Sequence, residues 1–365
     1  MPTTVRAVFL EDDASDRRRY AQRLTHSRSL DVRPLEFRGD GSEVSEILKA
    51  GPDVVLLDYE LIIGRPENRV QPGRGSTFAA LLREKLPDKP IVLVTRGSLI
   101  ESAAFGSAID LSAAFDEVVR KDHISNNPQQ VRETLISLVT GFHILASKRR
   151  RDWKSLLAIV GAREDEEDLV QRASPPILPV SDREWRTSEL ARWIRKILLG
   201  YPGILYSALF VSTALGLSVK SFASHPVQAY FVEAKYTRPF QPPGGAWWKG
   251  RVLDLAYSLL EKAQIPPTQY TEFGAAWSKL KRSHLSRSTC LWSKKPGADC
   301  VCYLEQQPVL RQFSLPYRPD SRPDVMDEAR VSFKAIRESE KFDEELVAPD
   351  SRHLVRGIQR GATSR

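Results

Sequence analysis

Five polar residues in the first third of the sequence stand at the ends of short apolar runs. They are Glu11, Asp12, Asp58, Thr95 and Lys121. Brought together, they suit phosphoryl chemistry. Crowded carboxylates repel one another and favour a hard divalent cation, and Mg²⁺ keeps coordination positions open for phosphate oxygens. An aspartate can attack a phosphoryl group to give an aspartyl phosphate, while the cation and a lysine stabilise its charge and a threonine hydroxyl binds one oxygen.

The apolar runs predict buried β-strands. Strands are expected at residues 5–10, 32–37, 54–57, 91–94 and 118–119. Helical patterns separate them at residues 15–24, around Ile47 and at 78–86. Strands and helices alternating at this spacing predict a doubly wound α/β fold with a five-stranded parallel sheet. The carboxyl ends of parallel strands share one crevice, so the five polar residues would meet there.

Residues 1 to about 145 resemble the receiver domain of two-component response regulators, which is flavodoxin-like. The matching motifs are Phe9-Leu-Glu-Asp-Asp13, Val54-Val-Leu-Leu-Asp58, Val92-Leu-Val-Thr95 and Val118-Val-Arg-Lys121. They occur in the order and at the spacing of that family. Any one of these strand ends is weak evidence, but the agreement of all of them is specific.

The resemblance implies a role for each polar residue. Asp58 would be the phosphoacceptor, Thr95 the switch hydroxyl and Lys121 the phosphate-contacting lysine. The implied Mg²⁺ ligands are Glu11, Asp12, Asp58 and the backbone carbonyl of Glu60. The partner would be a histidine kinase or a phosphotransfer protein. The chain would then be a phosphoacceptor rather than an enzyme, with at most self-phosphorylation from small donors and autodephosphorylation.

Four features depart from the family pattern. About a dozen residues from Gly64 to Arg74 are inserted before the third helix. Arg96 follows Thr95 where a small residue is usual, and it would either crowd the pocket or add a phosphate contact. Val118 stands where many receivers carry an aromatic residue, and Asp122 replaces the usual proline after Lys121. These changes leave the phosphorylation chemistry intact and bear on how it is read out.

Charge separates the two halves of the 365-residue chain. Residues 1–127 carry 18 Lys and Arg against 20 Asp and Glu, a net of −2, whereas the rest carries 36 against 26, a net of +10. A basic C-terminal part indicates that only this part meets a polyanion. We expect a receiver at 1–145, a helical linker at 146–180, a mostly helical α or α+β output domain at 181–320 and a charged tail at 321–365.

The output region has one local DNA-binding pattern. Residues 212–222 outline a helix-turn-helix unit with Ser218 as the N-cap of its second helix. That helix would direct four side chains toward a groove: Lys220, Ser221, Ser224 and His225. Ordinary helix packing explains the same pattern equally well. Regulation through DNA binding is therefore one hypothesis, and a protein-interaction output in a stress or defence system is the alternative.

Other residues could add contacts to nucleic acid. The basic candidates are Lys148 to Arg151, Arg192, Arg195, Lys196, Lys279, Lys281 and Arg282. The aromatic candidates for base stacking are Trp185, Trp193, Trp247, Trp248, Trp277 and Trp292. Most of these tryptophans are expected to be core or interface residues instead.

Zinc is a weaker hypothesis for the soft ligands of the output region. They are His284, Cys290, Cys300 and Cys302. Paired Cys-x-x-Cys knuckles are missing, which argues against a structural zinc site. Three cysteines cannot form a disulfide framework, and the N-terminus has no apolar secretory segment, so the cytoplasm is the expected location.

One uncharged stretch is long enough to test for a membrane span. Residues 197–219 carry no charge, but Pro202 and several hydroxyl residues argue against a spanning helix.

The sequence leaves open whether the chain forms a homodimer.

Overall fold

The computed structural model describes residues 4–63, 70–96, 114–147, 152–175, 187–200, 203–318, 327–339 and 342–361. The chain divides into two units. Unit 1 comprises the described residues of 1–160, 176–193 and 238–243, and unit 2 comprises those of 161–175, 194–237 and 244–365.

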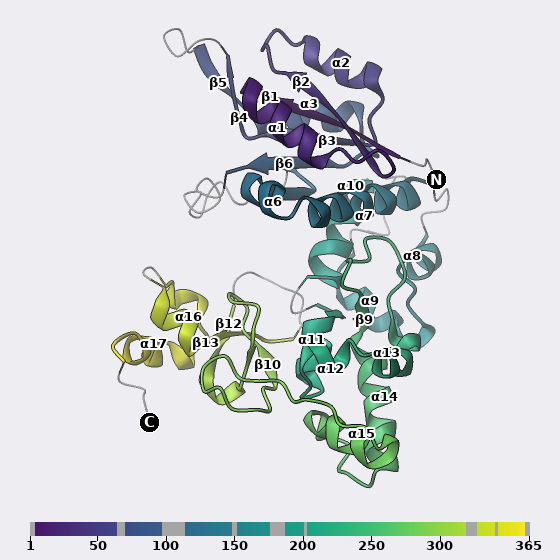
Figure 1. Cartoon of the computed structure of the whole chain (residues 1–365), viewed down its shortest axis with the longest axis vertical. Coiled ribbons are helices and arrows are strands. Elements are labelled where there is room, and N and C mark those ends of the chain that lie inside the picture. The colour runs from purple at the N-terminus through teal and green to yellow at the C-terminus, as the bar shows by residue number, and fades with distance from the viewer. Residues whose placement is uncertain are drawn as a thin grey trace. The chain divides into compact units, whose positions relative to one another are not determined.

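Unit 1 contains a five-stranded parallel sheet with the strand order β2-β1-β3-β6-β7 (Figure 1). Its strands are β1 (Val5–Glu11), β2 (Leu30–Glu36), β3 (Val54–Asp58), β6 (Ile91–Thr95) and β7 (Glu117–Arg120). Strands β3 and β6 are buried along their whole length. Helices cover both faces of a parallel sheet, which is why these two strands are uninterrupted apolar runs. The strand order is that of the flavodoxin-like doubly wound sheet, so the predicted fold is confirmed.

Helices lie on both sides of this sheet. They are α1 (Ala14–Leu24), α2 (Ser42–Ala50), α3 (Gly75–Lys85), α6 (Lys121–Asn126) and α7 (Pro128–Ser147). Ile47 of α2 and Leu82 of α3 share one apolar core with Leu57 of β3. Right-handed crossovers put α2 and α3 on that face and α1 on the other, because the chain moves across the sheet in opposite directions.

The predicted insertion folds in part as a hairpin. Strand β4 (Glu60–Ile63) pairs antiparallel with β5 (Val70–Arg74), and the insertion residues 64–69 between them lie outside the described part of the chain. The amide of Gly75 donates to the carbonyl of Tyr59 over 2.8 Å. The hairpin thus returns the chain to its starting point, and α3 begins beside the end of β3.

Two later segments of the chain belong to unit 1 and pack beside its α7. Helix α10 (Thr187–Trp193) contacts α7, and the Thr187 hydroxyl donates to Asp88 in the loop before β6. In the segment 238–243, the ring of Phe240 meets Phe142 of α7 edge-on with centroids 6.0 Å apart. Helix α7 therefore packs against two segments that come later in the sequence than the strands of the sheet.

Unit 2 contains a helical core with a small sheet. Its helices include α9 (Glu167–Arg172), α11 (Ala208–Ala214), α12 (Val219–Phe222), α13 (His225–Tyr230), α14 (Lys249–Lys262) and α15 (Phe273–Lys281). Strands β8 (Leu205–Ser207) and β9 (Ala246–Trp248) pair beside them. Phe222, Trp247 and Phe273 lie in one buried aromatic cluster. The aromatic residues of this region are thus mainly core.

A second core of unit 2 lies farther along the chain, around two short hairpins. Its elements are β10 (Cys300–Val301), β11 (Pro308–Val309), β12 (Ser314–Tyr317), β13 (Ala329–Ser332), α16 (Phe333–Glu338) and α17 (Arg352–Gln359). Val331, Ile336 and Val355 are buried in this core. The described residues of 321–365 are therefore folded.

Among the described residues, no helix is both long enough and apolar enough to cross a membrane. The uncharged stretch 197–219 includes parts of a π-helical turn (Ile194–Leu198), β8 and α11.

Candidate functional site

Three carboxylates meet at the carboxyl edge of the sheet in unit 1. Glu11 ends β1, Asp58 ends β3, and Asp12 follows β1. One carboxylate oxygen from each residue lies within 4.8 Å of those of the other two. Glu11 and Asp58 are buried and Asp12 is half-buried. The structure thus brings together the acidic residues that the sequence analysis singled out.

Lys121 supplies the opposite charge. It is the first residue of α6 and directly follows β7. Its Nζ lies 2.7 Å from Glu11 Oε2 and 3.2 Å from Asp58 Oδ1. The side chain is only 6% exposed. The ammonium group therefore joins the ends of two strands from a position shielded from water.

Burial shifts the pKa values of Glu11, Asp58 and Lys121. It raises the pKa of Glu11 to about 8, with help from the charge of Asp58 and against the attraction of Lys121. Burial likewise raises the pKa of Asp58 to about 6, against Lys121. For Lys121, burial lowers the pKa, but Asp58 and Glu11 outweigh it and the net direction is upward. One ammonium does not compensate the carboxylates, so the donor set fits a further hard cation such as Mg²⁺.

Thr95 stands at the end of β6 with a buried hydroxyl. The residue is 1% exposed, and Oγ1 has no hydrogen-bond partner among the described residues. Buried hydroxyls are usually paired, because an unpaired one costs about 1–3 kcal/mol. This hydroxyl is therefore available to an incoming acceptor oxygen.

Asp16 joins the site although it does not stand at the end of a predicted strand. It lies in the first turn of α1, four residues after Asp12. Its Oδ2 lies 3.4 Å from Lys121 Nζ and 3.4 Å from the guanidinium of Arg96. The signal that could have revealed it is a carboxylate one helical turn beyond the acidic pair. Arg96 pairs with Asp16, and its side chain is 71% exposed.

The backbone behind Asp58 requires glycine at position 75. A Cβ there would overlap the carbonyl oxygen of Asp58. Close approach of this kind is a reason for glycine beside a site. Glu60 begins β4, two residues after Asp58. The role of its carbonyl as a metal ligand stays a prediction.

The predicted helix-turn-helix unit is wrong in its second helix. Ser218 does cap α12 by accepting from the amide of Ser221, but α12 spans only four residues. A new helix, α13, begins at His225 with a proline in its first turn. Proline is favoured at a helix start and disfavoured inside one, so the two helices do not merge. A single turn cannot serve as a recognition helix in a major groove.

The other nucleic-acid candidates are mostly unsuited to contact bases. Trp193, Trp247, Trp248 and Trp277 are buried, as expected for core residues. Trp292 is half-buried and stacks under Arg337. The candidates in 148–151 and Trp185 lie outside the described residues. Lys281 and Arg282 are exposed and remain candidates for backbone contact.

The zinc hypothesis fails on geometry. His284 and the three cysteines are all described, yet no three of them gather as a metal-binding group. Each thiol serves a different backbone group: Cys290 accepts from the amide of Leu310, Cys302 accepts from that of Ser332, and Cys300 donates to the carbonyl of Val309. Burial raises the pKa of Cys300 to about 11.

The strand order β2-β1-β3-β6-β7 and the five polar residues at the carboxyl edge of this sheet decide the fold of unit 1. The N-terminal part of the chain has the fold of a receiver domain. No protein-family model and no curated protein sequence matches the chain.

Several solved structures are similar to the N-terminal part of the chain. A LuxR-family two-component response regulator from Aurantimonas sp. SI85-9A1 is 18% identical; the match covers 38% of this chain and 86% of that one, with a TM-score of 0.29. The N-terminal signal receiver domain of a response regulator from Bacteroides fragilis is 18% identical over 37% of this chain and 95% of its own, with a TM-score of 0.27. The RcsB response regulator of Salmonella typhimurium is 14% identical over 48% and 79%, with a TM-score of 0.28.

Proposed function

We propose that the chain is a response regulator of a two-component system that is phosphorylated on Asp58. The observation that carries this proposal is the position of Lys121, whose ammonium lies 3.2 Å from Asp58 and 2.7 Å from Glu11 within a cluster of three carboxylates. That arrangement combines a nucleophile, a fixed cation and ligands for a metal ion. Mg²⁺ would be held by Glu11, Asp12, Asp58 and the carbonyl of Glu60.

Bound Mg²⁺ would offset the charge of the phosphoryl oxygens. A carboxylate oxygen of Asp58 attacks phosphorus on a phosphohistidine of the partner kinase or phosphotransfer protein. The new O–P bond forms as the P–N bond breaks, and the electron pair leaves with the imidazole nitrogen. Lys121 then donates to a phosphoryl oxygen, and the unpartnered hydroxyl of Thr95 donates to another.

Labelling with acetyl phosphate tests this function. We expect radiolabelled phosphate to be incorporated into the full chain in the presence of Mg²⁺, and Asp58→Ala to abolish the labelling. Asp122→Ala is the matched control, because this carboxylate is exposed and pairs with Arg120 at 2.8 Å instead of joining the site. Equal labelling of Asp58→Ala and the unsubstituted protein would overturn the proposal.

For the output we propose regulation through DNA, supported by the net charge of +10 in residues 128–365. The alternative is a protein-interaction output without DNA contact, in a stress or defence system. The single turn of α12 favours that alternative. We propose no further enzymatic activity for the output region, and we place the protein in the cytoplasm, since its three cysteines are free thiols.

A further inference from the structure

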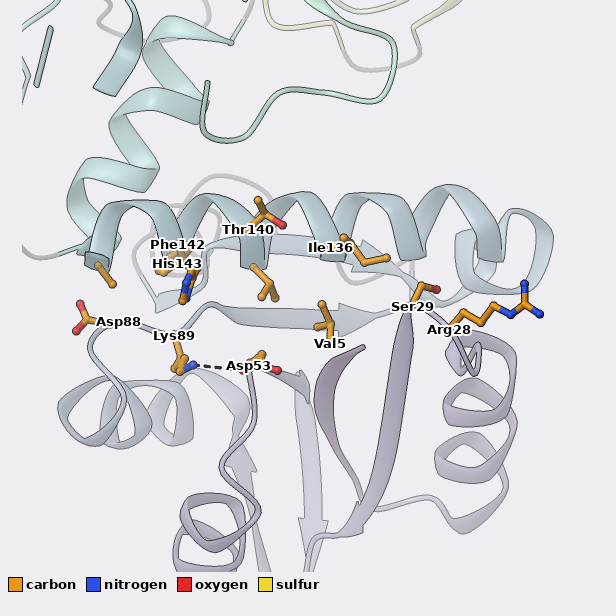
Figure 2. A pocket seen from close by; sticks show the side chains of 12 residues that line it. Val5, Arg28, Ser29, Asp53, Asp88, Lys89, Ile136, Thr140, Phe142 and His143 are labelled. Carbon is orange, nitrogen blue, oxygen red and sulfur yellow. Dashed lines mark hydrogen bonds and ion pairs between the residues drawn. The ribbon is translucent and has the colours of Figure 1, made fainter. Parts of the chain in front are cut away.

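A cavity of about 230 Å³ lies between helix α7 and the amino edge of the receiver sheet (Figure 2). The sheet side is formed by residues at or just before strand starts, such as Val5, Asp53 and Lys89. The phosphoacceptor site is at the opposite edge. The seven residues of β1 run from one edge to the other, and the six steps between them span about 20 Å at roughly 3.3 Å each. The cavity is therefore distinct from the phosphorylation site.

The cavity has an apolar middle and two polar ends. Val5 and Ile136 face each other across the middle in Figure 2, and Val139 of α7 also lines the cavity. Arg28 and Ser29 lie at one end. Asp88, Lys89 and His143 lie at the other. An occupant would thus be apolar along its body and polar at its tip.

Most charged groups that line the cavity have a hydrogen-bond or ion-pair partner among the described residues. Asp53 accepts from the amide of Arg6 over 3.0 Å and from Lys89 over 3.4 Å, so Lys89 is already paired. Asp88 accepts from the hydroxyl of Thr187. Arg28 has no hydrogen-bond or ion-pair partner in the part of the chain that the structure describes. Arg28 is exposed, and in Figure 2 its side chain points away from Val5 and Ile136, so its guanidinium must turn inward to meet an occupant of the cavity.

We propose that this cavity binds a small carboxylate with an apolar body. The guanidinium of Arg28 presents parallel N–H donors that match the two oxygens of a carboxylate. The body would lie against Val5, Ile136 and Val139, which are otherwise exposed to the cavity. The volume equals that of about eight water molecules at roughly 30 Å³ each, which suits a ligand of about ten non-hydrogen atoms. Neither the phosphoacceptor nor Mg²⁺ takes part.

Phenylacetate and octanoate are suitable probes, and 2-phenylethanol is the neutral control. We expect calorimetry on the full chain to show binding of both carboxylates. Arg28→Gln should weaken their binding about tenfold or more, because a charge-assisted hydrogen bond is lost, and should leave 2-phenylethanol unchanged. Arg33→Gln is the matched control, since Arg33 is exposed on β2 and does not line the cavity.

A second variant and a mapping experiment locate the ligand. Val139→Phe fills the middle of the cavity and should abolish binding of all three probes, with its fold checked by thermal unfolding. Phenylacetate should slow hydrogen exchange in residues 128–147. Asp58→Ala should bind as the unsubstituted chain does, which separates this site from the proposed phosphorylation. Absence of binding at millimolar probe, unchanged affinity in Arg28→Gln, or protection confined to other elements would overturn the proposal.

Discussion

At the scale of single residues, the site contains more negatively charged groups than positively charged ones. Lys121 faces Glu11, Asp58 and Asp16 within 3.4 Å. Burial removes the water that would otherwise separate these charges, so their interactions are strong. The loss of hydration on burial is the main cause of the raised pKa values of Glu11 and Asp58, and Lys121 opposes the rise. A proton or a divalent cation can relieve the excess negative charge.

The raised pKa values predict how stability depends on pH. Glu11 shifts from 4.5 to about 8 and Asp58 from 3.8 to about 6 in the folded protein. The folded state then binds more protons than the unfolded chain between about pH 4 and about pH 8, so without Mg²⁺ this contribution to stability is lost as the pH rises through that range. Mg²⁺ replaces these protons, and its stabilising effect should grow over the same range.

Thermal unfolding at about pH 5 and about pH 8, with and without Mg²⁺, measures this effect. Glu11→Gln is the comparison, because it removes the group with the larger shift. Without Mg²⁺, the melting temperature of Glu11→Gln should depend less on pH than that of the unsubstituted protein. A stabilisation by Mg²⁺ that is the same at both pH values would contradict the prediction.

Removal of the Thr95 hydroxyl should have opposite effects on stability and on the response to phosphorylation. Thr95→Val removes a buried hydroxyl that has no partner among the described residues, so the unphosphorylated protein should gain about 1 kcal/mol in its free energy of unfolding. The same variant should lose much of the rise in melting temperature that BeF₃⁻ produces. Thr95→Ser keeps the hydroxyl and should keep the response. A less stable Thr95→Val protein would show that the hydroxyl is already bound.

At the scale of elements, helix α7 connects the receiver sheet with later parts of the chain. Ser137 of α7 donates to the carbonyl of Gln241 over 3.0 Å. Phe240 packs its ring against both Phe142 and Gly141. Phe240 also has a backbone φ of 63°, which is unfavourable for an aromatic residue. The ring contact with α7 must therefore stabilise this conformation.

Gly141→Ala tests that contact. In an isolated helix alanine would be favoured over glycine by about 1 kcal/mol. Here the new Cβ would overlap the ring of Phe240, so we expect a net destabilisation of about 1–3 kcal/mol. In a Phe240→Ala background the same substitution should stabilise instead. Chemical denaturation of the four proteins in this double-mutant cycle measures the effect, and an unchanged sign would contradict the role of the ring.

At the scale of the whole molecule, the charge of the chain is divided between its parts. Residues 1–127 have a net charge of −2 and residues 128–365 one of +10. The near-neutral part contains a buried acidic site, so its net charge conceals a local concentration of carboxylates. Residues 187–193 and 238–243 belong to unit 1. A fragment cut at residue 160 would remove them from α7, so the full chain is the right material for testing the output.

DNA binding by the full chain should fall steeply with salt if the basic part contacts phosphates. Lys281→Gln should reduce the slope of log affinity against log salt by about 1. Lys49→Gln is the control, since Lys49 is exposed on α2 of the receiver domain. Fluorescence anisotropy over a salt series measures both slopes. If no binding appears at low salt, the protein-interaction output is supported instead.

The receiver sheet and its polar edge could be predicted from the sequence because their signals are local. An uninterrupted apolar run such as residues 54–57 indicates a buried strand, and the residue that ends it must lie at the edge of the sheet. The helix-turn-helix prediction failed because an N-cap such as Ser218 indicates where a helix begins but not how far it continues. Four residues of α12 carry the right local pattern, but the helix ends before it could extend into a groove.

The sequence alone thus determined the receiver fold, the acids of the site and the position of Lys121. Only the tertiary structure decided that Asp16 joins Lys121, that Phe240 packs on α7 and that Thr187 binds Asp88. It also decided that a cavity lies between α7 and the strand starts. These features depend on contacts between residues up to about a hundred positions apart. No periodicity within a segment encodes such contacts, because they arise only when the packed elements meet.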